Sequence, residues 1–173
     1  KLSPIGVFCL LCPVIASNGP AIIGSLAMVL LAAYICYIVH AVVVYSIAVK
    51  TMGGLSPVEF FKGMLPAIMF AFSSASSVGT LPINMECVEK MGASKEVTSF
   101  VLPLGATINM DGTAIYQGVC AIFIAACYGI QLTLPQMLTI ILTATLASIG
   151  TAGVPGAGMV MLAMVLTSVG LPV

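Results

Sequence analysis

Long parts of this chain contain no charged residue, and this absence constrains the fold more than any other feature of the sequence. No Asp, Glu, Lys or Arg occurs in residues 2–49, 63–85 or 97–110, and none follows Asp111. Charged residues make up 6% of the chain, whereas soluble globular proteins contain about 25%. Since roughly 20 consecutive apolar residues span a bilayer as a helix, the sequence predicts several membrane segments.

The composition excludes several other classes of protein. Hydrophobic residues reach 61% and mean hydropathy is +1.23, which excludes a disordered chain. The chain has no net charge, no Arg and no Trp, so it lacks the basic surface and the stacking platform of a nucleic-acid-binding protein. It begins with Lys1 and shows no leader with a cleavage site, so we expect an internal part of a longer membrane protein.

Two apolar segments carry polar, glycine-containing stretches near their centres. Residues 73–82 read Ser-Ser-Ala-Ser-Ser-Val-Gly-Thr-Leu-Pro, and residues 148–158 read Ser-Ile-Gly-Thr-Ala-Gly-Val-Pro-Gly-Ala-Gly. Backbone outside a helix cannot face hydrocarbon, so such stretches must lie inside protein or line a watery cavity. We therefore predict two helical hairpins, within 63–85 and 136–170, that each enter and leave the membrane on the same side.

The positions of the lysines favour this topology. If the first hairpin re-enters instead of crossing, all five lysines fall on one side of the membrane, as the positive-inside rule favours: Lys1, Lys50, Lys62, Lys90 and Lys95. The loops on the other side, 17–20 and 128–135, contain no Lys. A spanning helix at 21–49 then precedes the first hairpin, which enters the membrane from the inside. Another spanning helix at 97–127 precedes the second hairpin, which enters from the outside. Such an inverted repeat with paired interruptions indicates a secondary transporter that binds its ligands where the interruptions meet.

Asp111 is the sharpest candidate for a functional residue. An ionised Asp at the centre of a membrane helix costs at least about 2.5 kcal/mol, so it needs a partner or a cavity. Residues 105–113 read Gly-Ala-Thr-Ile-Asn-Met-Asp-Gly-Thr, and a locally unwound strand would align their alternating polar side chains. Gly105 and Gly112 lower the cost of that unwinding. No basic residue of the same segment can neutralise the acid. Asp111 could therefore bind a transported proton or a small hard cation that is also held by other oxygen ligands. Alternatively, it is a structural residue that stays protonated and forms a hydrogen bond with a neighbouring helix.

The other polar residues have simpler interpretations. His40 is the only His and has no acid near it in the sequence, so we interpret it as a helix-packing residue. An enzyme is not expected, because no Gly-x-Ser-x-Gly motif accompanies the serine run at 73–77. An intramembrane hydrolase would have to depend on His40. The six Cys are interpreted as packing residues.

Three motifs, at 73–82, 105–113 and 147–158, resemble the excitatory glutamate and neutral amino acid transporter family. Its bacterial and archaeal members are dicarboxylate/amino acid:cation symporters, and we interpret the chain as a fragment of such a member. The resemblance covers essentially the whole chain. It implies an all-α membrane protein with spanning helices and two opposed re-entrant helical hairpins, like the transport domain of that family.

The resemblance also assigns the segments of the chain. Residues 1–18 would be the end of the fifth, scaffold helix, and residues 19–173 a partial transport domain. Within it, the sixth helix, first hairpin, seventh helix and second hairpin would lie at 21–49, 57–92, 95–128 and 135–170. The family works as a homotrimer in which each transport domain moves like an elevator past its scaffold, with the second hairpin as the extracellular gate. The earlier helices and the final helix are absent, so we expect transport by the intact parent protein only.

The residues of the binding sites follow from the same resemblance. Substrate contacts would come from both hairpins and from the seventh helix, through Ser76, Ser77, Thr113, Val154 and Gly158. The cation sites would take the backbone carbonyls of Gly105, Asn109 and Met110, with the Asn109 and Asp111 side chains at a further site. Thr107 would join the carbonyls of Ser148, Ile149 and Thr151 in a gate-coupled site. Half-helix N-termini attract a carboxylate, and unwound carbonyls replace the water shell of sodium, which agrees with this assignment. Ala75 stands where some relatives carry an Arg, so that cation is missing here.

Together these features predict sodium-coupled symport of an acidic or small neutral amino acid, or of a dicarboxylate, by a multi-pass protein of the cell membrane. Sodium is the expected coupling ion, and no organic cofactor is expected. The expected partners are the small-molecule substrate, membrane lipid and further copies of the protein in a homotrimer. Proton-coupled symport is the alternative within the family. A non-transporting membrane scaffold is the alternative from another class, in which 57–92 and 135–170 would be ordinary spans.

Overall fold

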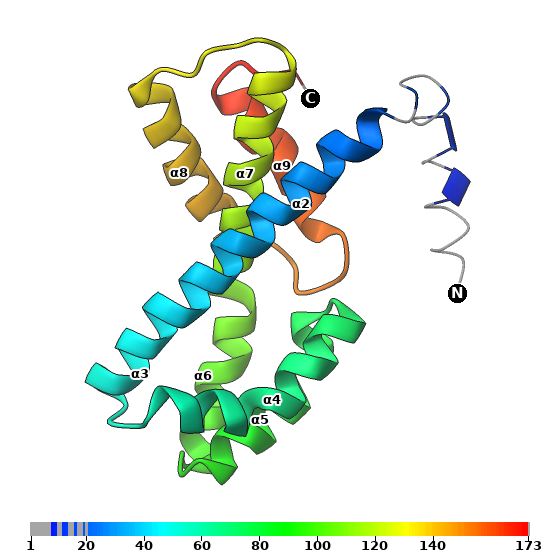
Figure 1. Ribbon diagram of the computed structural model, residues 1–173. Helices are drawn as coiled ribbons and strands as arrows, with labels where there is room; N and C mark the ends of the chain where they lie inside the picture. Colours follow the sequence, from blue (N-terminus) through cyan, green and yellow to red (C-terminus); the bar gives the residue numbers. More distant parts are fainter. Residues whose placement is uncertain (1–7, 10–11, 14–15, 17–18, 20, 173) are drawn as a thin grey trace.

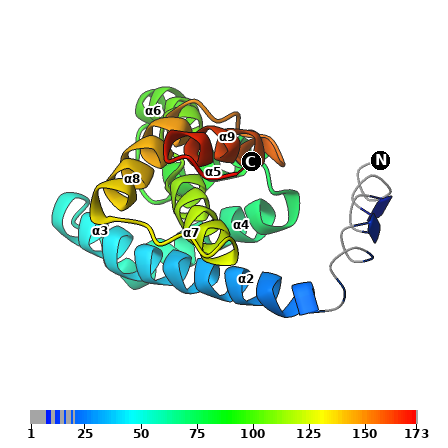
Figure 2. The same cartoon turned by 90° about the horizontal axis from the view of Figure 1, so that it is seen from above.

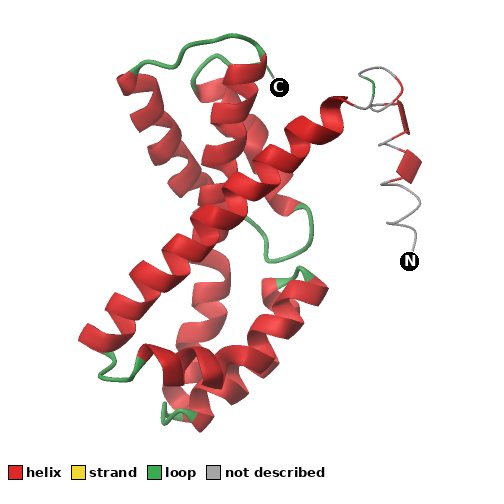
Figure 3. Ribbon diagram, viewed as in Figure 1, coloured by secondary structure: helices red, strands yellow, loops and turns green. Residues whose placement is uncertain are grey.

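The computed structural model describes residues 21–172 together with 8–9, 12–13, 16 and 19 (Figure 1). Every regular element between residues 21 and 172 is helical, as Figure 3 shows, so the predicted all-α fold is confirmed for this part of the chain. The predicted scaffold helix at 1–18 falls almost entirely outside the described residues. The elements are α2 (Ala21–His40), the π-helical turn η1 (Ala41–Tyr45), α3 (Ser46–Met52), α4 (Pro57–Ser74), α5 (Ser77–Lys90), α6 (Lys95–Ile108), α7 (Asp111–Cys127), α8 (Leu134–Ile149) and α9 (Ala157–Ser168).

Two helical stretches of the described residues are long and apolar enough to cross a membrane. The first is Gly24–Met52, which joins α2, η1 and α3, and the second is Lys95–Cys127, which joins α6 and α7. They agree with the spanning segments predicted at 21–49 and 97–127. Helix α2 packs across α7 and runs along one edge of the molecule (Figures 1 and 2). Most of its large apolar side chains are exposed, as expected where the surrounding solvent is lipid.

Helices α4 and α5 pack against each other as a hairpin whose turn consists of Ala75 and Ser76. Ala75 ends α4 in the left-handed conformation, with φ 49° and ψ 32°. The Ser76 hydroxyl then caps α5 by accepting a hydrogen bond from the Gly79 backbone N–H at 3.0 Å. The predicted interruption at 73–82 is therefore confirmed but too wide, because this cap restarts the helix at once and leaves Pro82 inside α5.

Helices α8 and α9 form the second packed pair, with a longer connection at 150–156. Thr133 and Gln136 form a capping box at the start of α8, and Pro135 lies in its first turn, where a missing N–H costs nothing. Gly156 precedes α9 with a positive φ of 83°, which glycine adopts without strain. The interruption predicted at 148–158 is confirmed, with slightly narrower limits.

The interruption between α6 and α7 is shorter than predicted. Only Asn109 and Met110 leave the helical conformation, with φ/ψ of −126°/75° and −111°/64°. Gly105 and Gly112 are helical, so the expectation that 105–113 unwinds as a strand is wrong. The break lies between the two glycines because α7 restarts at Asp111, where the carboxylate interacts favourably with the helix N-terminus.

The well-packed core lies where α7, α8 and α9 meet. Its most deeply buried large side chains, Ile140 of α8 and Val165 of α9, are surrounded by small alanines that let the helices approach closely. The buried cluster contains Ala121, Ala125, Ile140, Ala144, Ala147, Val165, Leu166 and Leu171. This core holds α7, α8 and α9 together as one packed unit.

Candidate functional site

The interruptions of the two helix pairs touch each other. The Gly153 carbonyl oxygen accepts hydrogen bonds from the Ser76 hydroxyl at 2.9 Å and from the Val78 backbone N–H at 3.2 Å. A Cβ atom on Gly153 would lie 2.8 Å from Val78 Cγ2 and 3.2 Å from the Val78 nitrogen. Only glycine therefore fits here without displacing the backbone, and the two connections are held together at this point.

A small cavity of about 190 Å³ opens where all three interruptions meet, and we name it the tip cavity. This volume is below the range of about 300–1,000 Å³ typical of sites for drug-sized ligands, so the cavity suits a small solute. Four of the five predicted substrate residues line it, whereas Ser76 caps α5 and is not among the lining residues. The tip cavity is lined by Ala75, Ser77, Met110, Thr113, Thr151, Ala152, Gly153, Val154, Gly156 and Gly158.

Three helix N-termini border the tip cavity. Helix α5 begins at Ser77, α7 begins just after Met110, and α9 begins just after Gly156. The first N–H groups of a helix lack intrahelical partners, and the helix dipole adds a partial positive charge at this end. Such ends bind carboxylates and phosphates, so the tip cavity favours an anionic group.

A second cavity, of about 400 Å³, lies on the other side of Met110, and we name it the Asp111 cavity. Five of the eight predicted cation ligands line it, namely Asn109, Met110, Asp111, Ser148 and Ile149. The remaining lining residues are His40, Ile108, Ala114, Ile115 and Thr145.

The other three predicted cation ligands lie elsewhere. Gly105 lines a separate polar cavity of about 310 Å³ together with Asn109. Thr151 lines the tip cavity, and its hydroxyl donates to the Ala147 carbonyl at 2.8 Å. Thr107 lines none of these three cavities and donates its hydroxyl to the Leu104 carbonyl at 2.8 Å. The structure thus distributes seven of the eight residues over three cavities and leaves Thr107 outside them.

The electrostatics of the Asp111 cavity are opposite to those of the tip cavity. Two helix C-termini border it, since α6 ends at Ile108 and α8 ends at Ile149. The N-terminus of α7 also borders it, and the Asp111 carboxylate offsets the partial positive charge there. The last carbonyl groups of a helix lack intrahelical partners and carry the negative end of the dipole. With the carboxylate of Asp111, these two ends make the cavity favourable for a cation coordinated by oxygen.

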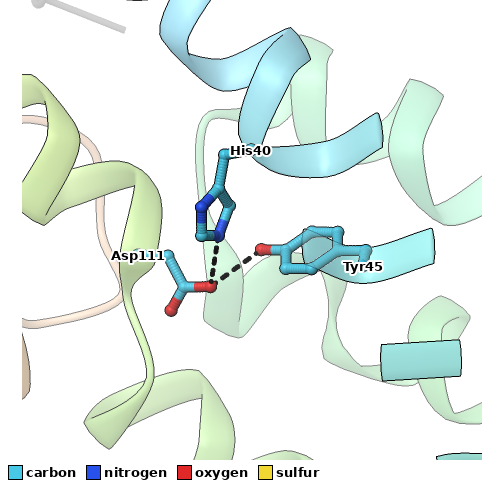
Figure 4. A network of polar contacts seen from close by, with 3 residues as sticks. All are labelled: His40, Tyr45 and Asp111. Atoms are coloured by element: carbon cyan, nitrogen blue, oxygen red, sulfur yellow. Dashed lines mark hydrogen bonds and ion pairs between the residues drawn. The ribbon is translucent and has the colours of Figure 1, made fainter. Parts of the chain in front are cut away.

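Two residues of the first spanning helix contact Asp111 directly (Figure 4). His40 Nε2 lies 3.0 Å from Asp111 Oδ2, and the Tyr45 hydroxyl donates to the same oxygen at 3.0 Å. When Asp111 is ionised its carboxylate only accepts, so the imidazole then donates this hydrogen bond from Nε2. The His40 and Asp111 side chains are 27% and 24% exposed, so the contact is partly accessible from the cavity.

This contact corrects the interpretation of His40 as a packing residue. The acid that it meets lies 71 residues further along the chain, so sequence proximity could not reveal it. Tyr45 was not predicted at all. The only available signal was that both residues bring polar atoms into a segment otherwise suited to lipid.

Comparisons with known proteins identify the family. The model of the sodium:dicarboxylate symporter family matches residues 1–173. The human excitatory amino acid transporters 2 and 1 are 44% and 43% identical over 173 residues, which cover 98% of this chain. A putative sodium-dependent excitatory amino acid transporter of Caenorhabditis elegans is 41% identical over 177 residues.

The chain spans about a third of the length of these relatives, at 30%, 32% and 35%. The family match nevertheless covers the whole chain, including the three helix interruptions and both cavities. On this evidence the chain belongs to the sodium:dicarboxylate symporter family, whose members are membrane transporters and not enzymes.

Proposed function

We propose that the complete protein carries an amino acid or a dicarboxylate across the cell membrane together with sodium. The observation that carries this proposal is the pairing of two neighbouring cavities with opposite electrostatic preference. Helix N-termini border the tip cavity, whereas helix C-termini and a carboxylate border the Asp111 cavity. Met110 lines both cavities, so a bound anion and a bound cation would lie on either side of one residue.

The substrate would bind in the tip cavity through Ser77, Thr113, Val154 and Gly158. Ser76, proposed from the sequence as a further contact, would hold the turn that carries Ser77, because its hydroxyl bonds Gly153 and Gly79. Its carboxylate would face the N-termini of α5, α7 and α9. The Thr113 hydroxyl, whose acceptor within the described residues is the weak Met110 Sδ at 3.9 Å, is available to a stronger partner. The relatives named as excitatory amino acid transporters support an amino acid as the substrate.

Sodium would be coordinated by oxygen atoms of the residues around the α6–α7 break and the end of α8. The Met110 carbonyl accepts from the Thr113 and Ala114 N–H groups, at 3.0 and 3.2 Å, so a sodium ion bound there would replace one of these donors. The Asp111 carboxylate provides the negative charge. The remaining proposed ligands are Gly105, Thr107, Asn109, Ser148, Ile149 and Thr151. The sodium-dependent relative supports this choice of ion over a proton.

The two helix pairs, 57–92 and 135–170, would be opposed re-entrant hairpins of an inverted repeat. The α3–α4 and α5–α6 connections lie at one end of the molecule, and the α7–α8 connection lies at the opposite end (Figure 1). Lys50, Lys62, Lys90 and Lys95 flank the first two connections, which favours a cytoplasmic position for that end. In the complete protein, residues 19–173 would move as part of an elevator-type transport domain of a homotrimer in the cell membrane.

Uptake of labelled substrate into liposomes containing the complete protein tests this function. An inward sodium gradient should drive accumulation, and Asp111→Asn, which removes the charge but keeps the shape, should abolish it. Glu86→Gln is the matched control, because this exposed acid pairs with Lys90 at 2.7 Å and lines neither cavity. Accumulation driven by a pH gradient without sodium would indicate proton coupling instead. Sodium-driven uptake by Asp111→Asn at the wild-type rate would refute the proposed role of this residue.

A further inference from the structure

The contact between the first spanning helix and Asp111 depends on an irregular turn. His40 ends α2, and the next five residues, Ala41–Tyr45, form the π-helical turn η1. In a π-helix each residue bonds to the fifth residue along the chain. His40 and Tyr45 are separated by that spacing, so the π-helical turn places one side chain above the other.

A regular α-helix would separate these two side chains. At 3.6 residues per turn, residues five apart point in directions about 140° apart around the axis. Both rings could not then reach one carboxylate. With the π-helical turn, the His40 and Tyr45 ring centroids lie 5.1 Å apart in an edge-to-face arrangement, and both side chains contact Asp111 (Figure 4). Single π-helical turns are frequent at functional sites.

Both donors contact the same carboxylate oxygen. His40 Nε2 and the Tyr45 hydroxyl each lie 3.0 Å from Oδ2, and no hydrogen bond to Oδ1 occurs within the described residues. Within the described residues Oδ1 thus keeps its lone pairs free, and Asp111 is one of the residues that line the Asp111 cavity. An imidazole and a phenol also lack the permanent positive charge of Lys or Arg, which would occupy the carboxylate in place of a cation.

We propose that His40 and Tyr45 are positioning residues for the coupling cation, which orient Asp111 through Oδ2 so that Oδ1 serves as the cation ligand. This inference rests on the proposed function. It adds two residues from outside the proposed ligand set and assigns a purpose to the π-helical turn. Hydrogen-bond partners of metal-ligating carboxylates fix ligand orientation, and their loss typically lowers metal affinity by about 10- to 100-fold.

The decisive variant is Tyr45→Phe in the complete protein, because it removes one hydroxyl and keeps the ring beside His40. The sodium concentration for half-maximal uptake should rise about 10-fold. The maximal rate at saturating sodium, and the substrate KM measured there, should stay within about twofold of wild type, since the tip cavity is unchanged. Tyr34→Phe is the matched control, because Tyr34 is a half-exposed tyrosine of the same helix whose ring packs on Tyr37.

A pair of His40 variants separates positioning from packing. His40→Gln keeps an N–H donor on a side chain of similar reach, whereas His40→Leu keeps only apolar volume. We expect His40→Leu to raise the half-saturating sodium concentration about 10-fold and His40→Gln to recover most of that loss. Equal losses in both variants would mean that the imidazole acts by packing alone and would overturn its assignment.

Sodium binding is also measured without transport, as the rise in melting temperature of the purified protein when sodium replaces choline. Each variant is compared with its own sodium-free baseline, so a general loss of stability does not affect the result. An unchanged or lower half-saturating concentration for Tyr45→Phe, with a normal wild-type response, would overturn this inference alone. A wild-type protein that shows no sodium response in melting or in uptake would overturn the proposed function and this inference together.

Discussion

The Ser76 hydroxyl donates a 2.9 Å hydrogen bond to the Gly153 carbonyl and thereby joins the α4–α5 turn to the α8–α9 connection. These residues lie 77 positions apart in the chain. The neighbouring N–H of Val78 donates to the same carbonyl at 3.2 Å. The contact closes one side of the tip cavity, so changes at Gly153 should affect substrate binding directly.

Gly153→Ala should weaken substrate binding. The added methyl group would lie 2.8 Å from Val78 Cγ2, and overpacking of this kind costs about 1–3 kcal/mol. We expect the substrate concentration for half-maximal uptake to rise about fivefold or more. Gly150→Ala in the same connection is the control, because its nearest contact would be Met161 Cε at an ordinary 3.8 Å. Similar effects of the two variants would contradict the importance of the Gly153 contact.

Ala75→Gly should stabilise the protein. Ala75 is the only residue other than glycine with a positive φ in the described part of the chain. A left-handed conformation costs an L-residue roughly 1–2 kcal/mol, and glycine avoids this cost. We expect an increase of about 1 kcal/mol in unfolding free energy and a higher melting temperature. The control is Ala71→Gly inside α4, which should lower the unfolding free energy by about 1 kcal/mol. If Ala75→Gly also lowered the stability, Ala75 would not be strained by its left-handed conformation.

Thr98→Val should loosen the junction of α5 and α6. Thr98 is 1% exposed, and its hydroxyl donates to Glu89 Oε1 at 2.9 Å. A hydrogen bond to a charged group contributes about 1.5–3 kcal/mol, and we expect a loss of that size in thermal unfolding. Ser99→Ala should change stability by less than about 0.5 kcal/mol, because Ser99 is exposed and bonds only its own helix, at Glu96. Equal effects would show that the Thr98–Glu89 contact is not stabilising.

Cysteine accessibility should identify the tip cavity as the substrate site. In a background from which all native cysteines are removed, Ser77→Cys and Ala152→Cys should react with a water-soluble thiol reagent, since both residues are exposed and line the cavity. Substrate should slow both reactions. Gly153 is unsuitable for this test because it is buried against Val78. Ala121→Cys, fully buried in the core, should stay unreactive. If substrate did not change the reaction rates of these two cysteines, the tip cavity would not be the substrate site.

The arrangement of helices could largely be predicted from the sequence. Charge-free runs located both spanning stretches, and polar stretches in apolar surroundings located all three interruptions, because backbone polar groups cannot be left bare in lipid. The limits of the interruptions could not be predicted, since they depend on local caps. The Ser76 hydroxyl restarts α5 immediately, and α7 restarts at Asp111 rather than after the predicted unwound stretch 105–113.

Asp111 was identifiable from sequence alone, because an isolated acid in a long apolar run is costly unless something compensates for it. What compensates for it was decided by tertiary structure. His40 and Tyr45 reach it from another helix, through a π-helical turn that no pattern in the sequence announces. The opposite preferences of the two cavities are likewise properties of packing. A helix carries its dipole wherever it lies, but only the packed fold gathers three N-termini around the tip cavity and places two C-termini and the Asp111 carboxylate around its neighbour, which shares the N-terminus of α7.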